Sequence, residues 1–172
     1  MHALLILDLQ IGLFHGPDQP WRGAELLEAV NSLLDKAHAA AAPVFLARHV
    51  GPPGSPLAPD SALTRLIPEL RLDGSETVFE KQRPSAFVGT GLLERLKEAD
   101  VSGLVICGMK TQYCVDSTCR AVRDLGLDAV LVEDGHSCSD TPLLNAEAIV
   151  GHHNATLAGP FCRLTKAADW QF

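Results

Sequence analysis

Cys114 is the side chain in this chain best placed for covalent chemistry. It follows an apolar run, Leu104–Cys107, and Gly108, and it falls in the first turn of a predicted helix. Ligands of open α/β sheets bind just beyond the carboxyl ends of the strands, so this position favours a reactive thiol. A helix N-terminus also stabilises negative charge and lowers the pKa of a thiol. We therefore expect a nucleophilic thiolate at Cys114.

Asp8 and Lys81 also stand where predicted strands end, after Ala3–Leu7 and Thr77–Glu80. Because parallel strands end at one edge of a sheet, the two side chains are expected to meet Cys114 there. A carboxylate at Asp8 could remove the thiol proton and later return it to a leaving group. The positive charge of Lys81 would hold the thiolate and steer the carboxylate. This combination predicts covalent catalysis on a carbonyl compound.

The turn from Met109 to Cys114 offers backbone N–H groups for the oxyanion that such an attack creates. Thr111 is predicted to cap the helix that follows. Each residue also has a structural interpretation when it is taken alone. A cysteine at a helix start is more often a small buried apolar residue, and a lysine among other charges is more often a solvated surface group.

Short apolar runs alternate with longer amphipathic segments, a pattern that predicts a parallel sheet wrapped by helices. The predicted strands are Ala3–Leu7, Val44–Ala47, Thr77–Glu80, Leu104–Cys107, Asp128–Val132 and Thr156–Leu157. The predicted helices are Gly23–Ala42, Thr90–Ala99, Gln112–Leu125 and a segment that runs from a cap at Asp140 or Thr141, through Pro142, to about His153. The segment Gly51–Pro59 is rich in proline and glycine and predicts an irregular loop.

The composition indicates a globular chain of one domain, residues 1–172, with 47% hydrophobic and 20% charged residues. A net charge of −7 argues against non-specific binding to nucleic acid. No apolar stretch is long enough to cross a membrane, and the first residues lack a signal-peptide pattern. The five cysteines form no disulfide scaffold. We therefore expect a reduced cytoplasmic protein.

Three motifs in order resemble those of the isochorismatase-like cysteine hydrolase family. They are residues 4–10 (LLILDLQ), residues 79–92 (FEKQRPSAF, then GTGL from position 89) and residues 108–121 (GMKTQYCVDSTCRA). The last motif is the most specific, and the resemblance extends from Ala3 to about Leu164. It implies a Rossmann-like, three-layer α/β/α sandwich with a six-stranded, mostly parallel sheet.

The resemblance also assigns roles to particular residues. It implies a catalytic triad of Asp8, Lys81 and Cys114, and a cis peptide bond between Met109 and Lys110. The backbone amides of Lys110 and Cys114 would form the oxyanion hole. Members of this family commonly assemble as dimers or larger oligomers, so a homo-oligomer is expected.

The segment after the second strand separates this chain from metal-dependent relatives. Nicotinamidases of the family carry an Asp-x-His metal motif there, whereas residues 47–52 (ARHVGP) hold one histidine, His49, and no carboxylate. We expect no metal and no cofactor. The cysteine at position 114 favours hydrolysis of a C–N bond in an amide, carbamoyl or ureido compound, through a thioester.

Two alternatives stay open at this point. One is hydrolysis of a vinyl ether of the isochorismate type, for which Cys114 is dispensable. The other is a non-catalytic or redox-responsive binding protein on the same fold. The substrate is expected to be a small molecule enclosed by Phe14, Trp21, His49, Phe87, Gln112, Tyr113 and His136.

Overall fold

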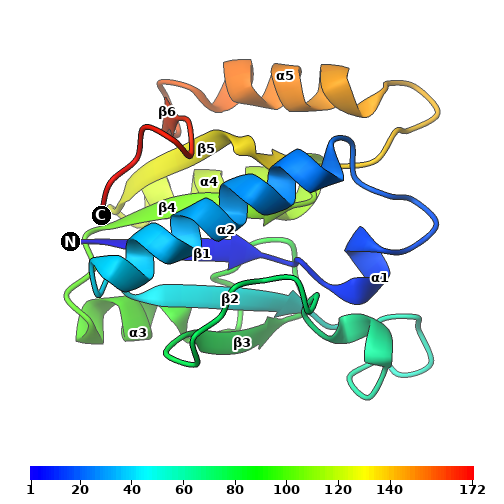
Figure 1. The fold of residues 1–172 in the computed structure, drawn as a ribbon, viewed down its shortest axis with the longest axis horizontal. Helices are drawn as coiled ribbons and strands as arrows, with labels where there is room; N and C mark the ends of the chain where they lie inside the picture. The colour runs from blue at the N-terminus through cyan, green and yellow to red at the C-terminus, as the bar shows by residue number, and fades with distance from the viewer.

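A six-stranded parallel sheet forms the centre of the protein (Figure 1). The computed structural model describes all residues, 1–172. The strands are β1 (His2–Leu7), β2 (Val44–His49), β3 (Thr77–Lys81), β4 (Gly103–Met109), β5 (Asp128–Ser137) and β6 (Arg163–Thr165). Their order is β3-β2-β1-β4-β5-β6, and every neighbouring pair is parallel. The predicted three-layer fold is confirmed.

Helices cover both faces of this sheet. They are α1 (Ile11–Phe14), α2 (Gly23–Ala39), α3 (Leu92–Glu98), α4 (Asp116–Asp124) and α5 (Ala146–Leu157). Figure 1 shows α2 crossing the near face of the sheet, with α3 and α4 behind it and α5 beside β5 and β6. No helix is both long and apolar enough to cross a membrane.

Side chains on the central strand β1 point alternately to the two faces, as the period of two residues in a strand requires. Ala3, Leu5 and Leu7 join the core cluster that packs under α3 and α4, whereas Leu4 and Ile6 join the cluster under α2. Both clusters are fully buried, which explains why the strand is a continuous apolar run rather than an alternating one.

The helix after β5 begins later than the sequence predicts. Asn145 caps it by accepting a hydrogen bond from the Ala148 N–H at 2.8 Å, so neither Asp140 nor Thr141 is the cap. Asp140 instead accepts a hydrogen bond from the Ala146 N–H, also at 2.8 Å. The segment around Pro142 is therefore a loop in front of the helix.

The end of this helix also differs from the prediction. Thr156–Leu157 is not a strand but the last turn of α5, where Leu157 is fully buried in the core beneath the sheet. The final strand is β6, Arg163–Thr165, which pairs with β5. Two residues are too few to show the alternation of a strand, and leucine favours a helix.

The polypeptide after β4 follows a different path from the predicted helix. A π-helical turn, Thr111–Val115, precedes α4, and this turn carries Cys114. Thr111 is not an N-cap, because its hydroxyl lies 2.9 Å from Nδ1 of His136 on β5. The contact with β5 decides the role of Thr111.

Gly108 allows β4 to turn toward this π-helical turn. Its φ is +115°, and a Cβ atom placed on it would lie 2.1 Å from the carbonyl oxygen of Leu7 on β1. The register of β4 with β5 also shifts between Ile106 and Gly108. Only glycine fits this backbone conformation and this close approach.

Candidate active site

Asp8, Lys81 and Cys114 meet at the carboxyl edge of the sheet. Asp8 directly follows β1, Lys81 is the last residue of β3, and Cys114 lies in the turn after β4. The Lys81 Nζ atom lies 2.7 Å from Asp8 Oδ2 and donates a hydrogen bond to Cys114 Sγ at 3.1 Å. The lysine therefore joins the carboxylate to the thiol.

All three side chains are almost completely removed from solvent: the exposed fraction is 0% for Asp8, 2% for Lys81 and 9% for Cys114. Burial raises the pKa of the Asp8 carboxyl, although the neighbouring Lys81 opposes the shift. Such a carboxyl is a stronger base than a solvated one.

The thiol of Cys114 does not have the lowered pKa that its place at a helix start predicts. Burial and the adjacent Asp8 carboxylate raise its pKa to about 12, and the Lys81 charge only partly offsets them. The resting site therefore holds a neutral thiol next to Asp8. Asp8 Oδ1 accepts no hydrogen bond within the protein, which leaves it available to receive a proton.

The backbone before Cys114 offers a donor for an oxyanion. The Met109–Lys110 peptide bond is cis, as the family resemblance implies. The N–H of Lys110 donates no hydrogen bond within the protein, whereas its carbonyl accepts from the N–H groups of Tyr113 and Val115. An amide without a partner beside a nucleophile can stabilise negative charge that develops on a substrate oxygen.

His49, the last residue of β2, is the predicted pocket residue that the structure brings to the triad. Its Nδ1 lies 3.4 Å from Lys81 Nζ. One ring nitrogen of His49, a carboxylate oxygen of Asp8 and Cys114 Sγ all lie within 4.8 Å of one another. A group of this kind can bind a cation, and the ammonium of Lys81 already contacts all three of its members.

The other predicted pocket residues have different surroundings. Phe14 is buried in the core under α2, and Phe87 packs against the core on the opposite face. Tyr113 is 55% exposed, whereas Gln112, its neighbour in the π-helical turn, has a buried side-chain oxygen that accepts no hydrogen bond.

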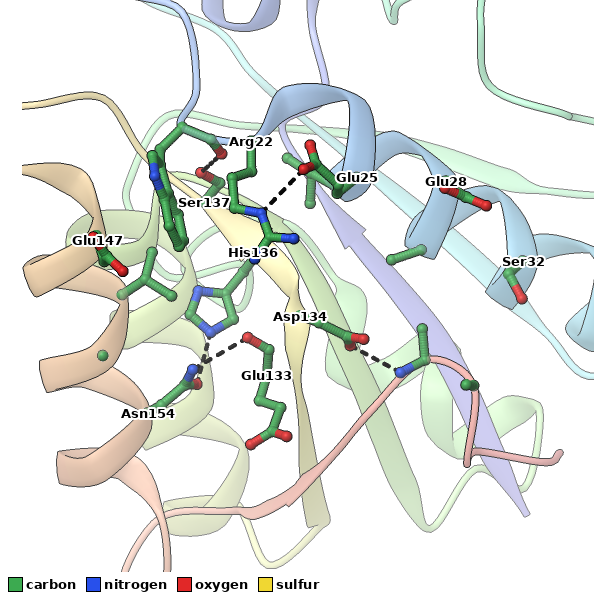
Figure 2. A pocket seen from close by; sticks show the side chains of 17 residues that line it. Arg22, Glu25, Glu28, Ser32, Glu133, Asp134, His136, Ser137, Glu147 and Asn154 are labelled. Atoms are coloured by element: carbon green, nitrogen blue, oxygen red, sulfur yellow. Dashed lines mark hydrogen bonds and ion pairs between the residues drawn. The ribbon is translucent and has the colours of Figure 1, made fainter.

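Trp21 and His136 line a separate cavity of about 560 Å³ between α2, the end of β5 and α5 (Figure 2). None of the triad residues lines it. His136 is buried at its wall, with Thr111 on one ring nitrogen and Asn154 on the other, both at 2.9 Å. Burial lowers the pKa of His136 to about 4, so this histidine is neutral.

A smaller cavity of about 360 Å³ lies beside Lys81. Its lining residues come from the ends of β2 and β3 and from the loop before α3, and they are Val50, Glu80, Lys81, Gln82, Arg83, Val88 and Gly89. Lys81 is the one triad residue among them, and its side chain is fully buried. None of its lining residues belongs to the substrate pocket that the sequence predicts, since Lys81 was predicted as a catalytic residue.

Gln10 is a site residue that the sequence analysis missed. Its fully buried amide accepts from the His49 N–H at 2.8 Å and donates to the carbonyl oxygens of His49 and Thr64, both at 2.9 Å. A polar side chain two positions after Asp8, within a buried run, was the signal available in the sequence.

Comparisons with known proteins identify the family of the chain. Residues 2–157 match the family model for the isochorismatase domain. A streptothricin hydrolase from Streptomyces noursei is 32% identical over 83% of this chain and 51% of its own length. The chain thus spans about half the length of that relative.

Solved structures share the fold. An isochorismatase from Pseudomonas putida has a TM-score of 0.89 and 29% identity, over 97% of this chain and 88% of its own. An N-carbamoylsarcosine amidase from Thermoplasma acidophilum has a TM-score of 0.85 over 99% of both chains and, at 17% identity, shows the likeness of fold alone. From its sequence, its fold and the family model, the chain belongs to the isochorismatase family of hydrolases.

Proposed function

We propose that this protein is a metal-independent cysteine hydrolase that cleaves a C–N bond in a small amide, carbamoyl or ureido compound. One observation carries the proposal: a single buried ammonium, that of Lys81, contacts both the Asp8 carboxylate and the Cys114 thiol. This arrangement supplies a base, a nucleophile and the charge that stabilises the thiolate, without any further cation.

The first step forms a tetrahedral intermediate on the sulfur of Cys114. Asp8 takes the proton from the Cys114 thiol as the sulfur attacks the carbonyl carbon of the substrate. The electron pair of the carbonyl moves onto oxygen, where the N–H groups of Lys110 and Cys114 stabilise the charge. Lys81 compensates the negative charge that passes from the carboxylate to the sulfur.

The C–N bond then breaks. The oxyanion re-forms the carbonyl as the electron pair of this bond moves to nitrogen. Asp8 gives its proton to that nitrogen, and the departing amine leaves a thioester on Cys114. Asp8 next removes a proton from water, which attacks the thioester carbonyl and releases the acid. The thiol recovers its proton at the end of the cycle, so atoms and charge balance.

The pKa values support the order of these events. A thiol with a pKa of about 12 is not a nucleophile by itself at neutral pH. The raised pKa of Asp8 makes this carboxylate a suitable partner for the transfer. The streptothricin hydrolase relative, whose name records a hydrolytic reaction, agrees with the reaction class.

Intact-protein mass spectrometry tests the proposal directly. We expect p-nitrophenyl acetate, and members of a panel of small amides and ureas, to leave an acyl group on Cys114. Cys114→Ser should lose the adduct and lower turnover about 10³-fold or more, since the nucleophile is removed. Cys107→Ser is the matched control, because it replaces another buried thiol, on β4. This variant should keep both the adduct and the turnover of wild type.

Turnover that survives in Cys114→Ser would contradict the thioester mechanism. If the surviving activity is on isochorismate, the reaction is vinyl-ether hydrolysis, with Asp8 as the proton donor. The absence of any adduct and any turnover across the panel would favour a binding protein instead.

A further inference from the structure

The ring of His49 is held by a group that can only donate hydrogen bonds. Its Nδ1 lies 3.4 Å from the ammonium nitrogen of Lys81. A lysine ammonium carries three N–H donors and no lone pair. For this contact to be attractive, Nδ1 must present its own lone pair, and the proton of the neutral ring must lie on Nε2.

The charges around the ring favour this neutral form. Lys81 is the titratable group in contact with His49, and Asp8 and Cys114 each place an atom within 4.8 Å of one of its ring nitrogens. Burial and the positive charge of Lys81 lower the pKa of His49, and the Asp8 carboxylate only partly opposes them. At neutral pH the ring therefore carries one N–H, on the nitrogen that faces away from Lys81.

The backbone of His49 is fixed independently of the ring. The side chain of Gln10 accepts a hydrogen bond from the His49 N–H, donates one to the His49 carbonyl oxygen, and is itself fully buried. Replacing the imidazole leaves these two hydrogen bonds in place. The ring is consequently free to serve a ligand, and its Nε2 has no hydrogen-bond partner within the protein.

We propose that His49 is a substrate-binding residue whose Nε2–H donates a hydrogen bond to a carbonyl oxygen that the substrate presents beside Cys114. This inference rests on the proposed function and adds a specificity element to it. The substrates it favours carry an acceptor oxygen at the reacting centre, as amide, carbamoyl and ureido compounds do.

The same geometry excludes the role of a general base for His49. A base needs a free lone pair, but Nδ1 is committed to Lys81 and Nε2 already carries the proton. The role therefore depends on a donor at the position of Nε2 and not on titration of the ring. An amide side chain of the right length can replace such a donor.

Three substitutions distinguish the two nitrogens. In His49→Gln, the side-chain amide nitrogen reaches the position of Nε2 and keeps the donor. In His49→Asn, the shorter amide reaches only the position of Nδ1, and His49→Leu removes both. Unfolding midpoints compared with wild type identify any variant that fails to fold. The hydrogen bonds of Gln10 to the His49 backbone, which we call the Gln10 clamp, should keep all three variants folded.

The probes are two alkylating agents, one with a carbonyl oxygen and one without. Iodoacetamide and allyl bromide both react at a CH₂ group, where the Cys114 sulfur forms the new bond, halide leaves and the thiol proton is lost. For iodoacetamide we expect His49→Asn and His49→Leu to react about fivefold to tenfold more slowly, the effect of one lost hydrogen bond. His49→Gln should retain a rate within about twofold of wild type, and allyl bromide should not distinguish the variants.

Two results would overturn the inference. One is an iodoacetamide rate at Cys114 that is the same in all three variants. The other is an equal slowing with both probes, which would mean that His49 acts on the thiol and not on the carbonyl. Failure of the proposed function looks different, because wild type itself would then form no acyl adduct at Cys114.

Discussion

Cys114 illustrates how burial can reverse an expectation drawn from local sequence. A helix N-terminus lowers the pKa of a thiol, but this thiol is 9% exposed and adjoins a carboxylate, and its pKa rises to about 12. In the proposed mechanism, the thiolate therefore forms only when Asp8 accepts the proton of Cys114. Lys81, which contacts both groups, keeps them together.

The raised pKa predicts how Cys114 affects stability at alkaline pH. Above pH 9 the unfolded chain releases the thiol proton, whereas the folded protein retains it up to about pH 12. The free energy of unfolding of wild type should therefore fall relative to Cys114→Ala by about 1 kcal/mol for each pH unit above 9. Urea unfolding at pH 8, 9 and 10 measures the difference.

Val115→Ala provides the control for this measurement. Val115 is fully buried in the same π-helical turn but does not titrate. Its difference from wild type should not change with pH. A difference between wild type and Cys114→Ala that is equally independent of pH would refute the raised pKa.

At the scale of elements, the path from β4 into α4 determines where the sulfur lies. Gly108, the register shift beside it and the π-helical turn Thr111–Val115 together replace the simple strand-to-helix connection that the sequence predicts. Hydrogen bonding of Thr111 to His136 attaches the turn to β5. The turn that carries Cys114, the proposed nucleophile, is thus held by contacts from two strands.

Gly108→Ala should be strongly destabilising. The new Cβ would lie 2.1 Å from the Leu7 carbonyl oxygen, so β1 and β4 would have to separate. We expect a loss of about 3 kcal/mol or more in the free energy of unfolding, beyond the roughly 1–2 kcal/mol cost of the left-handed backbone alone. Urea denaturation gives this value.

Gly126→Ala is the matched control. Its φ of +80° is also in the left-handed region, but a Cβ atom there meets no atom within 4 Å. Its cost should stay near 1 kcal/mol. Similar losses in the two variants would show that close approach at Gly108 is not the cause.

At the scale of the whole molecule, the site is assembled from parts of the chain that are far apart. Asp8 and Cys114 come from neighbouring strands, β1 and β4, whereas Lys81 reaches them across β2. Gln10 adds a second long-range connection, because its buried amide joins the end of β1 to His49 and to Thr64. The loop between β2 and β3 is therefore fixed against the edge of the sheet where Asp8, Lys81 and Cys114 meet.

Gln10→Leu should weaken both folding and activity. It removes three hydrogen bonds and leaves the backbone groups of His49 and Thr64 without partners. We expect a loss of about 2–4 kcal/mol in the free energy of unfolding and slower acylation of Cys114. Urea denaturation and the mass-spectrometric assay measure the two effects.

Asn31→Leu controls for stability alone. Asn31, on α2, bridges the Glu69 carbonyl oxygen and the Arg71 N–H in the same manner but lies outside the site. It should destabilise the protein without changing the acylation rate of the folded molecules. Unchanged acylation in Gln10→Leu would argue that the clamp has no part in the site.

Local patterns in the chain were sufficient for five of the six strands, for the helical layers and for the meeting of Asp8, Lys81 and Cys114, because apolar runs and strand ends are readable from neighbouring residues. These patterns did not predict the start of α5, the π-helical turn or the surroundings of Trp21 and His136. The protonation of the Cys114 thiol and the contact of His49 with Lys81 were also decided only by the tertiary structure. Burial, long-range hydrogen bonds and nearby charges set these properties, and each arises from residues distant in sequence.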